Sequence, residues 1–271
     1  MNWKDYCINQ KEKLKRKFLS SNIDNPVTFT DKLNYLKIYD SSLLKSFCAD
    51  KINLRNYCKQ KLGKNICIPI LAIYDYPEEI DWNSLPNKFV IKCNHGSGFN
   101  IIVKDKNNID KENCIKTLKK WMATDYGDIS FELFYNLIDK KVFIEEYKCL
   151  NDKSLGDYKF WCFNGIPRFF TINFNFGHGN INHYDLNGNL LDIERKDFPK
   201  NRNRKDKIPN SLPLMIEYSK KLSEDFKFVR VDFYEIDEIP FLGELTFIPG
   251  GGKLHYKDPN TNLILGNFLK L

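Results

Sequence analysis

The stretch from Lys88 to Lys104, KFVIKCNHGSGFNIIVK, constrains the fold more than any other part of this sequence. Two runs within it, Phe89 to Ile91 and Ile101 to Val103, have the β-branched and aromatic composition of buried strands. The segment between them carries three small residues: Gly96, Ser97 and Gly98. The stretch therefore predicts two strands joined as a hairpin by a flexible loop, with Lys92 at the entrance to that loop.

Two interpretations of this loop remain open. Glycines allow the backbone to come close to a ligand, so that amide groups can converge on phosphate oxygens while Lys92 supplies positive charge. A Gly-Ser-Gly segment between two strands can equally be a hairpin turn and nothing more. A Walker phosphate loop is excluded, because GxxxxGK[ST] is absent and a strand, not a helix, follows the glycines.

The overall composition restricts the class of protein. A chain of 271 residues can form one large domain or two small ones. A formal charge of +7 is compatible with anionic partners. Basic and acidic residues are interleaved, and no helix-turn-helix, zinc-finger or RNA-binding motif is present, so we expect no nucleic acid partner.

The cysteines and the apolar segments suggest where the protein works. The eight cysteines include no CxxC pair, and most have apolar neighbours, as expected for reduced thiols in the cytosol. The N-terminus lacks the apolar core of a secretory signal. The longest apolar run, Ile66 to Tyr74, is too short to span a bilayer. We therefore expect a soluble cytoplasmic protein.

Periodicity predicts most of the remaining elements. Helical spacing indicates helices over residues 3–19, 31–48, 52–62, 111–123 and 129–138, and a further helix from Ser211 to Phe226. Thr28 or Thr30 could cap the second of these helices, and Gly63 ends the third. Strands are expected over residues 66–74, 141–147, 157–164 and 167–174, the first of them buried. Residues 194–207 lack apolar periodicity and predict a solvated loop, with contact to an anionic substrate as the alternative.

The segment from Phe228 to Gly252 predicts a second hairpin, with its turn at Asp237 and Glu238. Alternation places Asp232 on one face of the first strand, with Arg230 and Tyr234. Glu244 and Thr246 share a face of the second strand. A two- or three-residue turn places Asp232 across from or beside Glu244, with Cβ atoms about 5 Å apart.

Two carboxylates this close need a compensating cation. Arg230 and nearby lysines could neutralise them, which would make the cluster purely structural. Alternatively, Mg²⁺ could bind there, with phosphate and water as its other ligands. The three glycines that follow, residues 250–252, favour a loop shaped around a ligand.

This order of motifs, from Asp50 to Gly252, resembles the ATP-grasp superfamily and, more closely, its TupA-like branch, which is associated with bacterial surface polysaccharides. The resemblance implies an α+β ATP-grasp fold, in which two α+β subdomains clasp ATP between antiparallel sheets. The expected parts are a helical N-terminal region (1–65), an N-terminal subdomain with the phosphate-covering loop (66–147) and a C-terminal subdomain with the metal site (148–271).

The same resemblance implies roles for individual residues. Lys51 and Lys92 match lysines that contact nucleotide phosphates, and the mobile loop over the phosphates corresponds to His95, Gly96, Ser97 and Gly98. The hinge that recognises adenine corresponds to Glu145, Glu146 and Tyr147, and Asp157 could contact the ribose. Arg230 matches a basic residue near the γ-phosphate, and Lys159, on the same strand face as Asp157, joins the catalytic set.

The implied metal ligands are Asp232, Glu244 and Thr246. The superfamily pattern is Glu-x-Asn, whereas this chain has Glu244-Leu245-Thr246. A threonine hydroxyl binds Mg²⁺ more weakly than an amide carbonyl does, so the number of metal ions bound, one or two, remains open.

The resemblance implies an ATP- and Mg²⁺-dependent ligase that joins a carboxylate to an amine through an acyl phosphate. A uronic acid of a capsular or wall glycan, or another small carboxylate, would be activated, and an amino acid or amino alcohol would supply the amine. His255 could help to remove a proton from the amine. Zinc bound by His178, His183 and His255 is disfavoured, because no cysteine or carboxylate shares their spacing. The alternatives are a kinase, a glycosyltransferase of polysaccharide biosynthesis, or a binding protein without catalysis.

Overall fold

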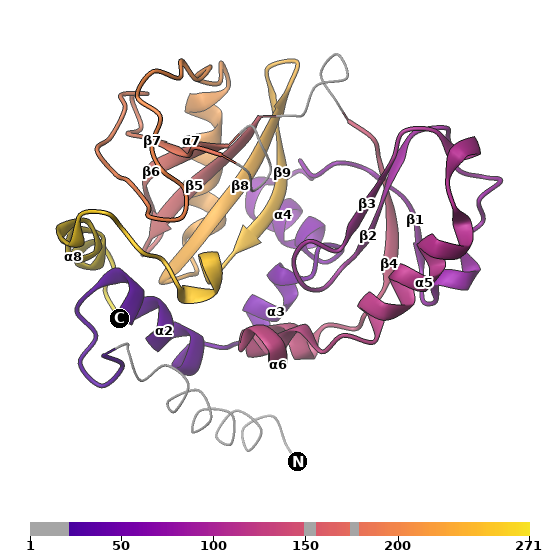
Figure 1. The fold of residues 1–271 in the computed structure, drawn as a ribbon, viewed down its shortest axis with the longest axis horizontal. Coiled ribbons are helices and arrows are strands. Elements are labelled where there is room, and N and C mark those ends of the chain that lie inside the picture. The colour runs from indigo at the N-terminus through magenta and orange to yellow at the C-terminus, as the bar shows by residue number, and fades with distance from the viewer. Residues whose placement is uncertain (1–21, 149–155, 174–178) are drawn as a thin grey trace.

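The computed structural model describes residues 22–148, 156–173 and 179–271, and in these residues two antiparallel sheets lie side by side (Figure 1). The first sheet has the order β1-β4-β2-β3. Its strands are β1 Ile70–Tyr74, β2 Phe89–Cys93, β3 Asn100–Val103 and β4 Val142–Glu146. The second sheet has the order β7-β6-β5-β8-β9. Its strands are β5 Asp157–Phe163, β6 Ile166–Asn173, β7 Asn182–Tyr184, β8 Phe228–Ile236 and β9 Ile239–Thr246. This confirms the expected fold class.

Helices cover both sheets and fill the space between them (Figure 1). The α-helices are α2 Phe29–Tyr39, α3 Leu43–Ala49, α4 Leu54–Leu62, α5 Lys111–Met122, α6 Tyr126–Ser130, α7 Leu212–Ser223 and α8 Pro259–Phe268. Short 3₁₀ helices are η1 Pro77–Glu79, η2 Lys106–Asn108, η3 Leu133–Leu137 and η4 Pro249–Gly252. The helix α3 contacts both η3 and β9, so it connects the two halves of the molecule.

Each sheet has its own hydrophobic core. The larger core joins the five-stranded sheet to α2, α4, α7 and α8, and its centre is aromatic: Phe29, Phe160, Phe163, Phe228 and Phe233 are almost completely buried. The smaller core lies between the four-stranded sheet and α5 and includes Phe89, Ile91 and Leu118. Side chains of this size supply much of the free energy of folding, at roughly 25 cal/mol for each Å² of apolar surface buried.

One main-chain contact joins the two sheets. Cys67 forms a parallel bridge with Leu242 of β9, and the Leu242 amide donates to the Ile66 carbonyl at 2.9 Å. A few residues later the same segment enters β1 of the other sheet. The chain that leads into the first sheet is therefore tied to the edge strand of the second.

Both predicted hairpins are confirmed. In the first, Phe89 pairs with Val103 and Lys92 pairs with Asn100. In the second, the turn residues Asp237 and Glu238 have φ of 50° and 63°. Positive φ at both central residues gives the twist that a two-residue hairpin needs.

Three sequence-based predictions are wrong in detail. The helix expected over 31–48 is interrupted, because Ser42 caps a separate helix, α3, by accepting from the Lys45 amide at 3.2 Å. The helix expected over 129–138 breaks at Phe131, whose left-handed backbone (φ 60°) separates α6 from η3. The strand over 66–74 shortens to β1 and is only half-buried, because it lies at the edge of its sheet.

Other predictions hold, with adjusted ends. Thr28 caps α2 in a capping box with Asp31, and Gly63 ends α4 in the left-handed conformation. Ser211 precedes α7, but its hydroxyl donates to Glu235 at 2.8 Å, and the helix ends at Ser223. Residues 194–207 form a loop without helix, apart from a bridge between Arg195 and Tyr256. The predictions for 3–19, Cys7, Cys149 and His178 lie outside the described residues.

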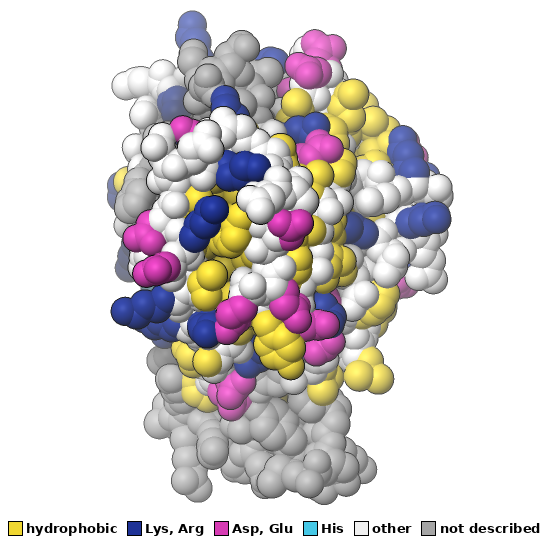
Figure 2. All heavy atoms as spheres, turned by 90° about the vertical axis from the view of Figure 1, so that its right-hand side faces the viewer, with side chains coloured by type: hydrophobic (Ala, Val, Ile, Leu, Met, Phe, Trp, Pro, Cys, Tyr) yellow, Lys and Arg dark blue, Asp and Glu magenta, His cyan; other side chains and the backbone are white. Residues whose placement is uncertain are grey.

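The described cysteines are buried, as their apolar neighbours in the sequence predict. Six cysteines within the described ranges are buried free thiols: Cys48, Cys58, Cys67, Cys93, Cys114 and Cys162. Within the same ranges, no helix is both long and apolar enough to cross a bilayer. On the face shown in Figure 2, lysines and arginines are interspersed with acidic side chains, so neither sign forms a continuous field there.

Candidate functional site

Lys51 lies at the junction of α3 and α4, beside the loop of residues 95–98 (the glycine loop). The Asp50 carboxylate fixes this junction by accepting from the Ile52 amide at 2.8 Å. The Lys51 amide donates to the Asn94 carbonyl at 3.0 Å, and its ammonium donates to the Gly96 carbonyl at 2.6 Å. Burial lowers the pKa of Lys51. The negative charge of Glu244 raises this pKa, and the positive charge of Lys92 lowers it. Lys51 is therefore close to charges from both sheets.

Lys92 extends from β2 and forms an ion pair with the carboxylate of Glu145 on the neighbouring strand β4. The same carboxylate also pairs with Arg55 of α4. Arg55 additionally donates to the Ile68 carbonyl at 2.9 Å. Sequence reasoning missed Arg55, which lies in the first turn of α4 and donates back to the Lys51 carbonyl.

The histidine of the glycine loop contacts α5. The His95 Nε2 atom lies 3.1 Å from the Trp121 carbonyl oxygen, and burial lowers the pKa of the ring to about 4. Gly96 and Gly98 have φ of 73° and 78°, which favours glycine. Ser97 is exposed at the tip and lies close enough to Tyr126 to lower the pKa of its hydroxyl, against a larger increase from burial. His95 thus anchors the loop, and the residues after it form its exposed tip.

The second half of the site is an alternating set of charges on β5, β8 and β9. Arg230 binds the Asp232 carboxylate through two hydrogen bonds, of 2.7 and 2.6 Å. Lys159 of β5 contacts the same carboxylate at 2.9 Å and also pairs with Asp157. Bidentate pairing of this kind fixes a guanidinium in one plane. The structure therefore brings together four predicted site residues at the centre of the five-stranded sheet.

Glu244 lies directly opposite Asp232 in the β8–β9 ladder, as predicted. Thr246 donates to Glu244 Oε1 at 2.9 Å, and Arg230 lies 3.6 Å from the same oxygen. Burial raises the pKa of Glu244, but the positive charges of Lys51, Lys159 and Arg230 outweigh it and lower the pKa to about 2. Glu244 is therefore ionised at neutral pH.

Electrostatic interactions connect the two halves of the site. Lys51, which is fixed to the glycine loop of the first sheet, exerts the largest attractive charge effect on Glu244 of the second. Burial raises the pKa of Tyr234, and the carboxylates around it reinforce that shift. They come from both sheets: Asp157, Glu244, Asp232 and Glu145. Lys92, which also acts on Lys51, is part of the same arrangement.

The charged side chains of Lys51 and of strands β2, β4, β5, β8 and β9 described so far form one group, the charge cluster. Three predicted residues lie apart from it. Glu146 pairs with Lys148 at 2.7 Å, and the Tyr147 ring lies 6.0 Å from the Lys88 ammonium, so both are at the end of β4. His255 is exposed, and its carbonyl accepts from the Lys196 amide at 2.8 Å. The contacts of the described residues do not connect the His255 side chain to the cluster.

The carboxylates at this site could serve a hard cation. No group of three or more histidine, cysteine or acidic side chains suited to a metal occurs among the described residues. The opposed pair Asp232 and Glu244 supplies carboxylate oxygens, and Thr246 supplies a hydroxyl, which are ligands that Mg²⁺ accepts. Glu244 fits best, because it is ionised and 39% of its side chain is exposed. Asp232 is occupied by Arg230 and Lys159, so a metal there would displace at least one of them.

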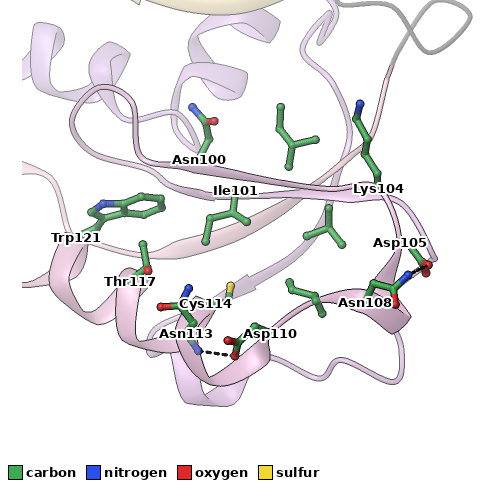
Figure 3. Close-up of a pocket in the computed structure, with 13 residues that line it drawn as sticks. Asn100, Ile101, Lys104, Asp105, Asn108, Asp110, Asn113, Cys114, Thr117 and Trp121 are labelled. Carbon is green, nitrogen blue, oxygen red and sulfur yellow. Dashed lines mark hydrogen bonds between the residues drawn. The ribbon is translucent and has the colours of Figure 1, made fainter.

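A separate cavity of about 670 Å³ lies between β3 and α5, away from this cluster (Figure 3). Its walls include Ile101 and Lys104 from the hairpin and Cys114, Thr117 and Trp121 from α5. None of the predicted site residues lines it. The charge cluster between the sheets, and not this cavity, is therefore the candidate active site.

Comparison with known proteins agrees with the fold. No curated protein matches the sequence. The solved L-amino acid ligase from Bacillus licheniformis has a TM-score of 0.52 and 10% identity, over 89% of this chain and 55% of that one. The D-alanine–D-alanine ligase from Helicobacter pylori has a TM-score of 0.47 and 19% identity, over 82% of this chain and 61% of that one. This chain therefore spans less than two thirds of either structure.

A family model gives the most specific match. The model described as TupA-like ATPgrasp matches residues 31–270, which is most of the chain. These residues include both sheets and the charge cluster between them. The likeness to the ligase from Bacillus licheniformis shows the fold independently. The chain belongs to the TupA-like ATP-grasp family.

Proposed function

We propose that this protein is an ATP-dependent ligase that joins a carboxylate to an amine. The observation that supports this most directly is the placement of Lys51 beside both the glycine loop and Glu244. Cations that suit phosphate and carboxylates that suit magnesium then meet in one cleft, as a bound nucleotide requires.

The nucleotide phosphates would bind on the side of the first sheet. Lys51 and Lys92 supply positive charge, and the tip of the glycine loop, with Ser97 exposed, can approach the phosphates closely. The adenine and ribose would lie near the end of β4. Glu145 is paired with Lys92 and Arg55, so its role is to position Lys92, while Glu146, Tyr147 and Asp157 remain the candidates for contact with the nucleoside.

Asp232, Glu244 and Thr246 would hold Mg²⁺. When bound, the metal supplies neutralisation of phosphate charge and polarises the phosphoryl oxygens. Glu244 keeps its negative charge for this purpose, since its pKa is about 2. Arg230 and Lys159, which pair with Asp232 in this structure, would turn toward the transferred phosphoryl group.

In the reaction, an oxygen of the substrate carboxylate attacks the γ-phosphorus, and the bond from that phosphorus to the bridging oxygen of ADP breaks. The resulting acyl phosphate is attacked by the amine at its carbonyl carbon. The carbon–oxygen bond to phosphate breaks, the nitrogen loses a proton, and an amide and inorganic phosphate remain. Arg230 and Lys159 stabilise the negative charge that develops on the phosphoryl oxygens.

For the substrate, we propose a uronic acid carboxylate of a capsular or cell-wall polysaccharide or its precursor, because the TupA-like branch is associated with such polymers. The net charge of +7 favours an anionic saccharide. We place the enzyme in the cytoplasm, since six buried free thiols suit a reducing compartment. We also propose the division into residues 1–65, 66–147 and 148–271.

A phosphate-release assay with panels of acids and amines tests this function. Release that needs both a carboxylate and an amine supports ligation, whereas ADP formation with a hydroxyl compound alone would indicate a kinase. Lys92→Ala and Glu244→Ala should each weaken binding of Mg-ATP. Unchanged affinity in both variants would remove the proposed nucleotide site.

A further inference from the structure

A second cavity lies next to the charge cluster and takes no part in the nucleotide site proposed above. It has a volume of about 180 Å³ and lies between α2, the α6–η3 segment and the glycine turn of η4. The charged side chains that line it are Lys37, Glu132 and Lys253. At roughly 30 Å³ for each water molecule, this space suits a small metabolite and not a polysaccharide chain.

Two walls of this cavity connect it to the reaction centre. The η4 turn follows β9, which carries Glu244 and Thr246. Another wall is formed by Tyr126, which packs against Gly96 of the glycine loop. The negative charge of Glu244 also acts on Glu132. A molecule in this cavity is therefore close to the place where an acyl phosphate would form.

The three charged groups have different environments. Lys37 is buried, and its ammonium donates to the Gly251 carbonyl at 2.9 Å, so it holds the glycine turn in place. Glu132 is buried, with 6% of its surface exposed. Lys253 is exposed and forms no ion pair with any residue of the described ranges. The cavity thus combines a buried carboxylate with a solvent-facing ammonium.

We propose that this cavity binds the amine substrate and that this substrate is a small amino acid, whose ammonium contacts Glu132 and whose carboxylate contacts Lys253. A carboxylate accepts hydrogen bonds from an ammonium, and a lysine donates to a carboxylate. A zwitterion can therefore pair with Glu132 and Lys253 at the same time. An amino alcohol would leave Lys253 without its partner. The inference rests on the proposed function only in naming this amino acid as the attacking amine.

Binding of small probes to the full chain tests the site directly. Alanine and glycine would be titrated, with ethanolamine and propionate as probes that each lack one of the two charges. We expect both amino acids to bind about tenfold more tightly than either probe, because each probe loses one charge-assisted contact. Equal affinities for alanine, ethanolamine and propionate would overturn the proposal.

Variants locate the two contacts. Lys253→Gln should reduce the affinity for alanine to that of ethanolamine and leave ethanolamine unaffected, whereas Glu132→Gln should weaken both. Lys257→Gln, an exposed lysine of the same segment that does not line the cavity, is the matched control. Unchanged affinity for alanine in both Lys253→Gln and Glu132→Gln would contradict the assignment. If Glu132→Gln does not fold, the exposed variant Lys253→Gln still tests the proposal.

The same titrations separate this inference from the proposed function. The probes would be added with and without Mg²⁺ and a nonhydrolysable ATP analogue. Alanine binding without nucleotide affinity would support the amino acid site and reject the ligase. Nucleotide binding without discrimination among the probes would reject the amino acid site alone.

Discussion

Asp232 and Glu244 occupy directly opposed positions on β8 and β9, yet their surroundings differ. Asp232 is buried and held by Arg230 and Lys159, whereas Glu244 accepts from Thr246 and is partly exposed. The pair therefore divides the work of a metal site: one carboxylate is fixed by neighbouring cations, and the other is available to a ligand.

Glu244→Gln should weaken Mg²⁺ binding and slow the use of ATP. Loss of one charged metal ligand should lower kcat by about a hundredfold or more, equivalent to roughly 3 kcal/mol of transition-state stabilisation. The decrease should be constant from pH 6 to pH 8, because the Glu244 pKa is about 2. Steady-state kinetics with Mg²⁺ titration measures it, and Glu238→Gln in the exposed hairpin turn serves as the control.

Gly96→Ala should impair the glycine loop more than Gly98→Ala. Both positions have positive φ, which costs an alanine about 1–2 kcal/mol. A Cβ at position 96 would in addition lie 2.9 Å from atoms of Phe99 and Tyr126, whereas a Cβ at 98 has no neighbour within 4 Å. We expect a higher KM for ATP in the first variant. Equal KM values in the two would show that packing of the loop is unimportant.

Arg55→Met should destabilise the protein and weaken nucleotide binding together. Glu145 keeps Lys92 as a partner, so the loss should be about 1–3 kcal/mol, less than for a buried charge left alone. Urea denaturation and ATP titration measure the two effects. Lys59→Met, an exposed position on the same helix, should change neither.

The stability of the wild type should fall between pH 5 and pH 7 through Glu132. Burial raises the pKa of Glu132 to about 7, from the usual value of 4.5, and Lys37 opposes this shift only in part. A folded-state pKa above the unfolded value gives stability that is complete below the unfolded pKa and is lost as the pH rises through the folded one.

The Glu132→Gln variant, which cannot ionise at this position, should lack this decrease. Its free energy of unfolding relative to the wild type should therefore rise by about 1–3 kcal/mol between pH 5 and pH 8. Chemical denaturation at the two pH values provides the measurement. A parallel decrease in both proteins would assign the pH dependence to other groups.

Much of the fold could be read from local sequence patterns. Strand alternation and a short turn predicted that Asp232 lies across from or beside Glu244, but their direct pairing also needs the register shift between Asp232 and Phe233, which the alternation does not reveal. The hairpin around Lys92 was readable from local patterns of the same kind. The role of Lys51 came from a resemblance, since spacing alone does not show that a helix start lies beside a distant loop.

Other features depend on tertiary contacts that local patterns do not reveal. The pairing of Arg55 with Glu145 joins residues 90 positions apart in the chain. The left-handed Phe131 interrupts a segment whose apolar spacing is helical, and such a break is unusual for an aromatic residue. The exposure of β1 follows from its place at the sheet edge, which its apolar composition conceals.

The bridge between Cys67 and Leu242 has a mechanical consequence. When the two sheets move apart, this bridge must either stay intact or break. If it stays intact, the sheets rotate about the bridge, and the residues farthest from it move most. The exchange rate of the Leu242 amide proton, which is donated to the Ile66 carbonyl, therefore reports whether this contact breaks. If this proton exchanges with solvent no faster than those of the central strands, the enzyme admits its substrates by rotation and not by separation of its halves.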